Sequence, residues 1–164
     1  MTNLIQPESS RFSLPFSTIS SSASETFTIG KRLASLLEKQ SIVALRGPLG
    51  AGKTCLAKGL ARGLGIDEEV TSPTYSIVCE YEAVVCGEKI PVYHIDAYRL
   101  GGNDDFAAIG GKEIVFGEGI SVIEWSERIG DYIPAGAFKV DFEIIGENKR
   151  NIRIYKDKNE YPGH

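Results

Sequence analysis

The chain has 164 residues, 42% hydrophobic and 24% charged, a composition typical of a globular protein with a buried core. Its net charge of −4 argues against a protein that binds nucleic acid alone, because contacts with phosphates need clustered Lys and Arg side chains. The three cysteines lack the spacing of a zinc or redox motif, and no run of about 18 apolar residues indicates a membrane span.

The N-terminal part of the sequence predicts an edge strand followed by a helix. Residues 1–10 are polar, and we expect them to be flexible. The run RFSLPFSTI predicts a strand at the edge of a sheet, because its proline cannot donate to a neighbouring strand. Ser22 and Glu25 match a capping box, so a helix should begin here and continue to about Lys39.

Strands and a helix alternate in the middle of the chain. The β-branched run SIVALRG predicts a buried strand, and KTCLAKGLARGLG predicts a helix that ends at a glycine. Two longer runs, SIVCEYEAVV and KIPVYHIDAYRL, predict strands joined by a turn near Gly87. Elements of these types in this order indicate an α/β domain.

The C-terminal part of the sequence adds strands to the same sheet. GGNDDFAAIGGKE predicts a loop with a short helix, and GISVIEW predicts another buried strand. Apolar and polar residues alternate on both sides of a turn in AFKVDFEIIGENKRNIRIYKDK, which predicts a C-terminal β-hairpin. We therefore expect one domain over residues 11–158 with a mixed, partly parallel central sheet, and a flexible C-terminus over residues 159–164.

The segment GPLGAGKT predicts a phosphate-binding loop. Gly47, Gly52, Lys53 and Thr54 fit the pattern G-x-x-x-x-G-K-[ST], between a predicted buried strand and a predicted helix. Glycines let backbone N–H groups converge on one anion, and the helix N-terminus adds partial positive charge. Lys53 is expected to reach the β and γ phosphates, and Thr54 to bind Mg²⁺. The sequence thus predicts a three-layer fold like that of P-loop NTPases.

A site of this kind needs a carboxylate near its metal ion. Glu124 ends the apolar strand ISVIE, and Asp96 ends VYHID. Because Glu124 follows the more apolar strand, we favour it as the acid beside the metal. Asp96 would then orient the attacking water or hold a metal-bound water. The alternative for either residue is a solvated carboxylate at a strand end.

Three further features lie close to these residues in the sequence. Residues 71–74, Thr-Ser-Pro-Thr, form either a loop that senses a γ-phosphate or an ordinary turn. Trp125 is the only tryptophan; if the strand continues through it, its side chain faces away from Glu124 and anchors a core or an interface. His94 shares a strand face with Asp96, and a structural histidine is favoured over a ligand.

The choice of nucleotide and reaction is narrowed by two missing motifs. Residues 148–151 are the nearest match to the guanine-reading pattern [NT]-K-x-D and lack its acid, which favours ATP. An arginine-rich lid does not occur between the phosphate-binding loop and Glu124, so a small-molecule kinase is the less favoured alternative. A nucleotide-sensing module without hydrolysis is a third hypothesis.

The chain resembles the TsaE (YjeE) family of bacterial P-loop ATPases in four segments that occur in one order: GPLGAGKT, TSPTYSIVCEY, YHIDAYRL and VIEW. The resemblance runs from about Thr26 to Arg153. It implies an ATPase that is slow alone and acts with a TsaB–TsaD heterodimer to form threonylcarbamoyladenosine on tRNA. Such a protein would be cytoplasmic, without a membrane partner, and would reach tRNA only through the complex.

The resemblance also implies roles for individual residues. It makes Thr54 and Glu124 the Mg²⁺ ligands, and Lys53, Asp96 and Glu124 the catalytic residues. Contacts with ATP are expected from Thr26, Leu49, Gly50, Ala51, Gly52, Lys53, Thr54, Cys55, Ser72, Thr74, Trp125 and Arg150. Cys55 stands where the family often has a second threonine.

Overall fold

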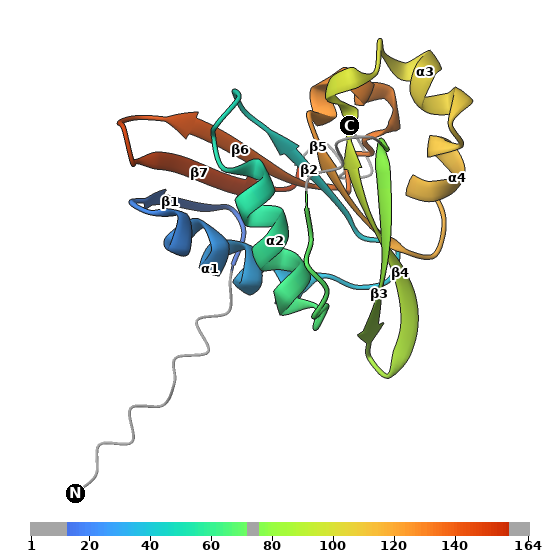
Figure 1. The fold of residues 1–164 in the computed structure, drawn as a ribbon, viewed down its shortest axis with the longest axis horizontal. Coiled ribbons are helices and arrows are strands. Elements are labelled where there is room, and N and C mark those ends of the chain that lie inside the picture. The colour runs from blue at the N-terminus through green and yellow to red at the C-terminus, as the bar shows by residue number, and fades with distance from the viewer. Residues whose placement is uncertain (1–12, 72–75, 158–164) are drawn as a thin grey trace, which may run out of the picture.

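One sheet of seven strands organises the structure, a computed structural model that describes residues 13–71 and 76–157 (Figure 1). The strands are β1 (Phe16–Ser20), β2 (Ile42–Arg46), β3 (Val78–Val85), β4 (Glu88–Asp96), β5 (Ile120–Glu124), β6 (Phe138–Ile144) and β7 (Arg150–Tyr155). The α-helices are α1 (Ala23–Leu33), α2 (Lys53–Gly63), α3 (Asn103–Ala108) and α4 (Gly111–Val115). Short 3₁₀ segments are η1 (Ala34–Leu36), η2 (Ala97–Arg99) and η3 (Ser126–Tyr132). The predicted domain limits, at residues 10–11 and 158–159, lie outside the described residues.

The sheet has the strand order β1-β7-β6-β2-β5-β4-β3. Its central strands β6, β2, β5 and β4 are parallel, and the pairs β6–β7, β7–β1 and β4–β3 are antiparallel. This confirms the predicted α/β fold with a mixed, partly parallel sheet and a C-terminal hairpin. Because the carboxyl ends of parallel strands meet at one edge, the loop after β2 lies beside the ends of β4 and β5.

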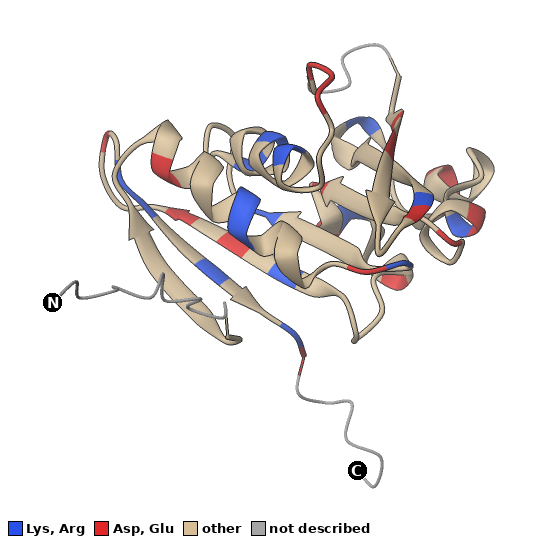
Figure 2. Cartoon of the chain, turned by 90° about the horizontal axis from the view of Figure 1, so that it is seen from below, with Lys and Arg blue, Asp and Glu red and all other residues tan. Residues whose placement is uncertain are grey.

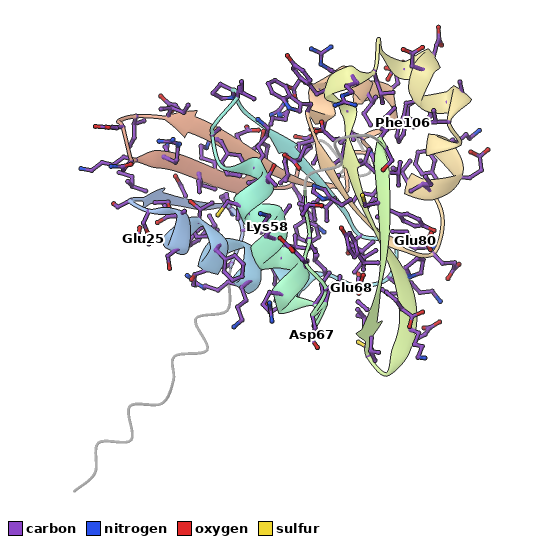
Figure 3. All side chains as sticks on the ribbon, viewed as in Figure 1. Glu25, Lys58, Asp67, Glu68, Glu80 and Phe106 are labelled. Carbon is purple, nitrogen blue, oxygen red and sulfur yellow. The ribbon has the colours of Figure 1, made fainter. Side chains whose placement is uncertain are left out.

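Helices cover both faces of the sheet and complete the three predicted layers. On one face, α1 and α2 pack against alternate strand residues such as Leu45 and Val140. On the other face, α3, α4 and η3 enclose a second core around Phe106 (Figure 3). Acidic and basic residues are interspersed along the strands and helices (Figure 2). None of the helices in the described ranges is long and apolar enough to cross a bilayer.

Two predictions for the N-terminal part are confirmed. Strand β1 begins directly after Pro15 and lies at the edge of the sheet. Helix α1 begins with a capping box, in which Ser22 Oγ accepts from Glu25 N at 3.1 Å. The Glu25 carboxylate accepts in turn from Ser21 N at 2.6 Å. The helix ends earlier than predicted: α1 stops at Leu33 and only the η1 turn follows, because the chain turns back here to enter β2.

Helices α1 and α2 approach each other closely at glycines. A Cβ on Gly30 would stand 2.1 Å from Leu56 O, and one on Gly59 would stand 1.9 Å from Phe27 O. The backbone of each helix therefore occupies the space that a side chain on the other would need. This explains the glycines at both positions, and it places the start of α2 beside the start of α1.

The linker between β4 and β5 differs from its prediction. It contains two short helices, α3 and α4, where a single helix was expected. Gly110 separates them with a φ of 81°. The two helices bury Phe106 and Val115 against the sheet, so apolar packing stabilises turns that the glycine-rich sequence alone does not favour.

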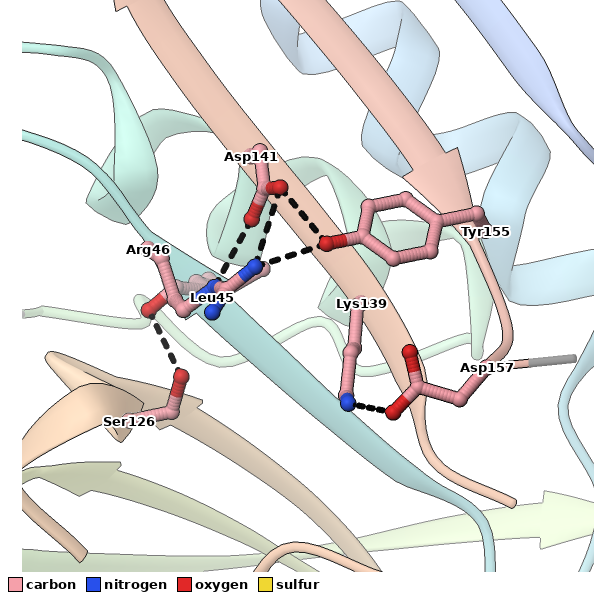
Figure 4. Close-up of polar contacts among 7 residues, drawn as sticks. All are labelled: Leu45, Arg46, Ser126, Lys139, Asp141, Tyr155 and Asp157. Atoms are coloured by element: carbon pink, nitrogen blue, oxygen red, sulfur yellow. Dashed lines mark hydrogen bonds and ion pairs between the residues drawn. The ribbon is translucent and has the colours of Figure 1, made fainter. Parts of the chain in front are cut away.

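The end of β2 is held by polar contacts on both sides (Figure 4). Arg46 donates to both Asp141 oxygens, at 2.8 and 3.0 Å, and to Tyr155 Oη at 2.6 Å. Tyr155 donates to Asp141 at 2.7 Å, which closes a three-membered network between β2, β6 and β7. Ser126 Oγ donates to Leu45 O at 3.2 Å. These contacts position the residue that directly precedes Gly47.

Candidate nucleotide-binding site

The loop between β2 and α2 has the backbone of a phosphate-binding loop. Gly50 and Gly52 adopt φ values of 78° and 103°, which side-chain-bearing residues rarely adopt. Gly47 is crowded, since a Cβ there would stand 2.8 Å from the Phe142 Cβ. Helix α2 begins at Lys53, so its first unpaired N–H groups face this loop. Both the glycines and the helix N-terminus therefore suit an anion.

Lys53 lies inside the loop rather than in solvent. Its side chain is buried, and Nζ donates to Gly47 O at 2.6 Å and Pro48 O at 2.9 Å. The same Nζ lies 4.0 Å from the centroid of the Trp125 ring. Burial lowers the pKa of Lys53, while nearby carboxylates, Glu124 foremost, act in the opposite direction. The amine is thus held inside the loop, against its carbonyl groups and the Trp125 ring.

Thr54 and Glu124 are joined by a hydrogen bond across α2 and β5. Thr54 Oγ1 donates to Glu124 Oε1 at 2.7 Å. The other carboxylate oxygen lies 2.6 Å from His94 Nε2 on β4, and both residues are buried. Asp96 is the register partner of Glu124 one strand away, and its Oδ1 accepts from Tyr98 N at 3.0 Å. Glu124 is therefore the carboxylate in contact with Thr54.

The Thr54–Glu124 pair suits a magnesium ion. Hydroxyl and carboxylate oxygens are hard donors of the kind that Mg²⁺ prefers, and the ion usually takes only one or two protein carboxylates beside phosphate oxygens and water. Here one hydroxyl and one carboxylate oxygen lie 2.7 Å apart at the start of α2. The donor types and their proximity therefore fit the implied metal.

Trp125 does not continue strand β5, contrary to one of the expectations for it. Its φ of 57° and ψ of 40° are left-handed, and the chain turns there into η3. The indole therefore does not face away from the site but lies against Lys53 Nζ. The Tyr98 ring packs on it, with centroids 4.9 Å apart. Trp125 thus lines the site together with the motif that contains Asp96.

A cavity of about 210 Å³ opens beside the loop, and six of the residues expected to contact the nucleotide line it. It is lined by Ser22, Ala23, Thr26, Gly50, Ala51, Gly52, Cys55, Asn148 and Arg150. Arg150 Nη2 donates to Gly50 O at 3.1 Å, which ties the C-terminal hairpin to the loop. Cys55 Sγ donates to Ala23 O at 3.1 Å, and burial raises the pKa of the thiol.

Other predicted residues lie outside this cavity. Leu49 is 80% exposed at the tip of the loop. Ser72 and Thr74 lie outside the described residues. Three residues of the cavity lining were not predicted as contacts: Ser22, Ala23 and Asn148. Ser22 was visible in the sequence only as a helix cap, and Asn148 only as the start of the imperfect match to the guanine-reading pattern.

The comparisons with known proteins agree with this geometry. The family described as threonylcarbamoyl adenosine biosynthesis protein TsaE matches residues 20–152. The tRNA threonylcarbamoyladenosine biosynthesis protein TsaE of Treponema pallidum is 41% identical over 136 residues, which cover 83% of this chain and 97% of that protein. Its counterpart in Bacillus subtilis is 35% identical over 137 residues, covering 84% and 83%. The crystal structure of Bacillus subtilis YdiB matches with a TM-score of 0.69 and 31% identity, covering 89% and 88%. The chain belongs to the TsaE family of tRNA threonylcarbamoyladenosine biosynthesis proteins.

Proposed function

We propose that this chain is a Mg²⁺-dependent ATPase that acts with a TsaB–TsaD heterodimer in the formation of threonylcarbamoyladenosine on tRNA. The observation that carries the proposal is the hydrogen bond of 2.7 Å between Thr54 and Glu124, beside the buried amine of Lys53. A cation held by Thr54 and Glu124 would then share the loop with the Lys53 ammonium group and the N-terminus of α2. That combination suits the polyphosphate of a nucleotide.

Each residue of the site has a role in this proposal. Backbone N–H groups of the loop and the Lys53 amine bind and orient the phosphates. Thr54 and Glu124 hold the ion, which when bound neutralises charge on the phosphate oxygens. Asp96, beside Glu124 in the sheet, orients the attacking water. The nucleoside occupies the cavity between the start of α1 and the C-terminal hairpin.

Membership of the TsaE family favours tRNA modification over the small-molecule kinase. A net charge of −4 agrees with a protein that reaches tRNA through partners. We therefore expect the chain in the cytoplasm, where it would reset the TsaB–TsaD complex between turnovers.

Hydrolysis of ATP by the purified chain, with and without TsaB–TsaD, tests the proposal. We expect slow turnover alone, stimulation by the heterodimer, and loss of nucleotide binding in Lys53→Ala. Glu124→Gln should bind nucleotide but lower kcat by about 100-fold. Lys58→Ala is the matched control, because this lysine is exposed on the same helix (Figure 3).

Two results would contradict different parts of the proposal. Wild-type nucleotide affinity in Lys53→Ala would remove the phosphate-binding role of the loop. If TsaB–TsaD neither bound the chain nor changed its turnover, the partnership would be wrong even with an intact ATPase.

A further inference from the structure

His94, Glu124 and Thr54 form a buried chain of hydrogen bonds that spans β4, β5 and α2. Glu124 lies in its middle, with Oε1 2.7 Å from Thr54 Oγ1 and Oε2 2.6 Å from His94 Nε2. The His94 and Glu124 side chains are each 4% exposed. Water therefore has little access to either carboxylate oxygen, and the orientation of the carboxylate depends on these two neighbours.

The chemistry of the pair determines which atom donates. An ionised carboxylate has only acceptors, so the short contact requires a hydrogen on His94 Nε2. The Thr54 hydroxyl supplies the donor for the other oxygen. Each oxygen of Glu124 thus has its own donor, one from α2 and one from β4. Rotation of the carboxylate would break both bonds.

The second ring nitrogen shows that His94 is not placed for general packing. Among the described residues, His94 Nδ1 is buried and has no hydrogen-bond partner. Leaving a buried polar atom unsatisfied costs free energy, which a leucine or methionine in this position would avoid. The histidine therefore brings a cost that its hydrogen bond to Glu124 helps to offset.

We propose that His94 is a positioning residue for Glu124. By holding Oε2, it keeps Oε1 directed at Thr54, so that a metal ion between the loop and β5 meets a single, fixed carboxylate oxygen. Hydrogen bonds to a ligating carboxylate generally strengthen metal binding in this way. The inference rests on the proposed function, because it assumes that Glu124 and Thr54 bind a divalent cation.

The test uses Mn²⁺ as the probe, with electron paramagnetic resonance on the full chain in the presence of a non-hydrolysable ATP analogue. His94→Leu removes the donor, and we expect its affinity for Mn²⁺ to fall about 10- to 100-fold. His94→Gln keeps an N–H donor near the position of Nε2 and should recover most of that loss. The affinity for the analogue without metal should stay unchanged in both variants, because Lys53 and the loop are intact.

Two further variants separate positioning from folding. Ser121→Ala removes the other buried polar atom that lacks a partner among the described residues, on the opposite face of β5, and should bind Mn²⁺ normally. His94→Asn is polar but its amide corresponds to Nδ1, so it should bind Mn²⁺ as weakly as His94→Leu. If the leucine variant does not fold, the difference in Mn²⁺ affinity between His94→Gln and His94→Asn tests the positioning role.

The outcomes distinguish this inference from the proposed function. Wild-type Mn²⁺ affinity in His94→Leu, or equal affinities in the Gln and Asn variants, would overturn the role of His94 and leave the ATPase proposal intact. Failure of the wild-type chain with bound analogue to bind Mn²⁺ would overturn both. A selective loss in His94→Leu and His94→Asn, with rescue by His94→Gln, supports the positioning role.

Discussion

The side chains around the phosphate-binding loop are paired with protein groups. Lys53 donates to two loop carbonyls, Thr54 donates to Glu124, and Arg150 donates to Gly50 O. A bound nucleotide therefore exchanges existing hydrogen bonds for new ones. Its affinity reflects the difference between the two sets, because a hydrogen bond that merely replaces another contributes little net free energy.

Cys55 provides a chemical probe of this site. Its thiol is half-buried and burial raises its pKa, so little reactive thiolate is present at neutral pH. We expect iodoacetamide to modify the exposed Cys86 several-fold faster than Cys55, as measured by mass spectrometry of the peptides. ATP should slow the reaction of Cys55 further, because this residue lines the cavity.

Cys79, on strand β3, is the control for this experiment. It is about as accessible as Cys55 but does not line the cavity, so ATP should leave its rate unchanged. Protection of Cys79 together with Cys55 would indicate a general change in the fold. An unchanged rate for Cys55 at saturating ATP would place the nucleotide away from the cavity.

Among the elements, the contact between α1 and α2 gives the clearest prediction. Gly59→Ala should lower the free energy of unfolding by about 1–3 kcal/mol, because its Cβ would stand 1.9 Å from Phe27 O and the helices would have to separate. Helix propensity alone predicts the opposite sign, since alanine favours a helix by about 1 kcal/mol over glycine. Urea unfolding followed by circular dichroism measures the difference.

Gly130→Ala is a suitable comparison for this variant. A Cβ at Gly130 would meet no atom within 4 Å, and the residue is exposed in η3. The free energy of unfolding of the Gly130→Ala variant should differ from that of the unchanged protein by less than about 0.5 kcal/mol. Stabilisation by Gly59→Ala would show that the backbones of α1 and α2 do not approach each other closely at this glycine.

Local patterns in the sequence predict the elements but not how they meet. The buried strands β2 and β5, the capping box of α1 and the C-terminal hairpin follow from the spacing of apolar and capping residues. The phosphate-binding loop was predictable because its motif is continuous. The contact between His94 and Glu124 was not, because it depends on the register of β4 against β5, which no local pattern specifies. The turn at Trp125 was not predictable either, because it depends on a left-handed backbone conformation, and the apolar pattern of β5 gives no sign of it.

For the whole molecule, charge is the property that bears most directly on function. Acidic residues outnumber basic ones by 22 to 18, and the two kinds are interspersed over the fold (Figure 2). Several basic side chains are engaged with acidic neighbours: Lys39 with Glu88 and Glu118, and Arg46 with Asp141. Such pairs reduce the positive charge that is available to a polyanion.

The isolated chain should therefore bind tRNA weakly. We expect a dissociation constant above about 10⁻⁵ M at physiological salt, because contacts with phosphates need clustered cations that release counterions. Fluorescence anisotropy with labelled tRNA measures this directly. Addition of TsaB–TsaD should produce a complex that contains all three proteins and tRNA, since the partners would supply the contacts. Submicromolar binding by the chain alone, weakened steeply by salt, would instead make this protein itself the tRNA-recognising component.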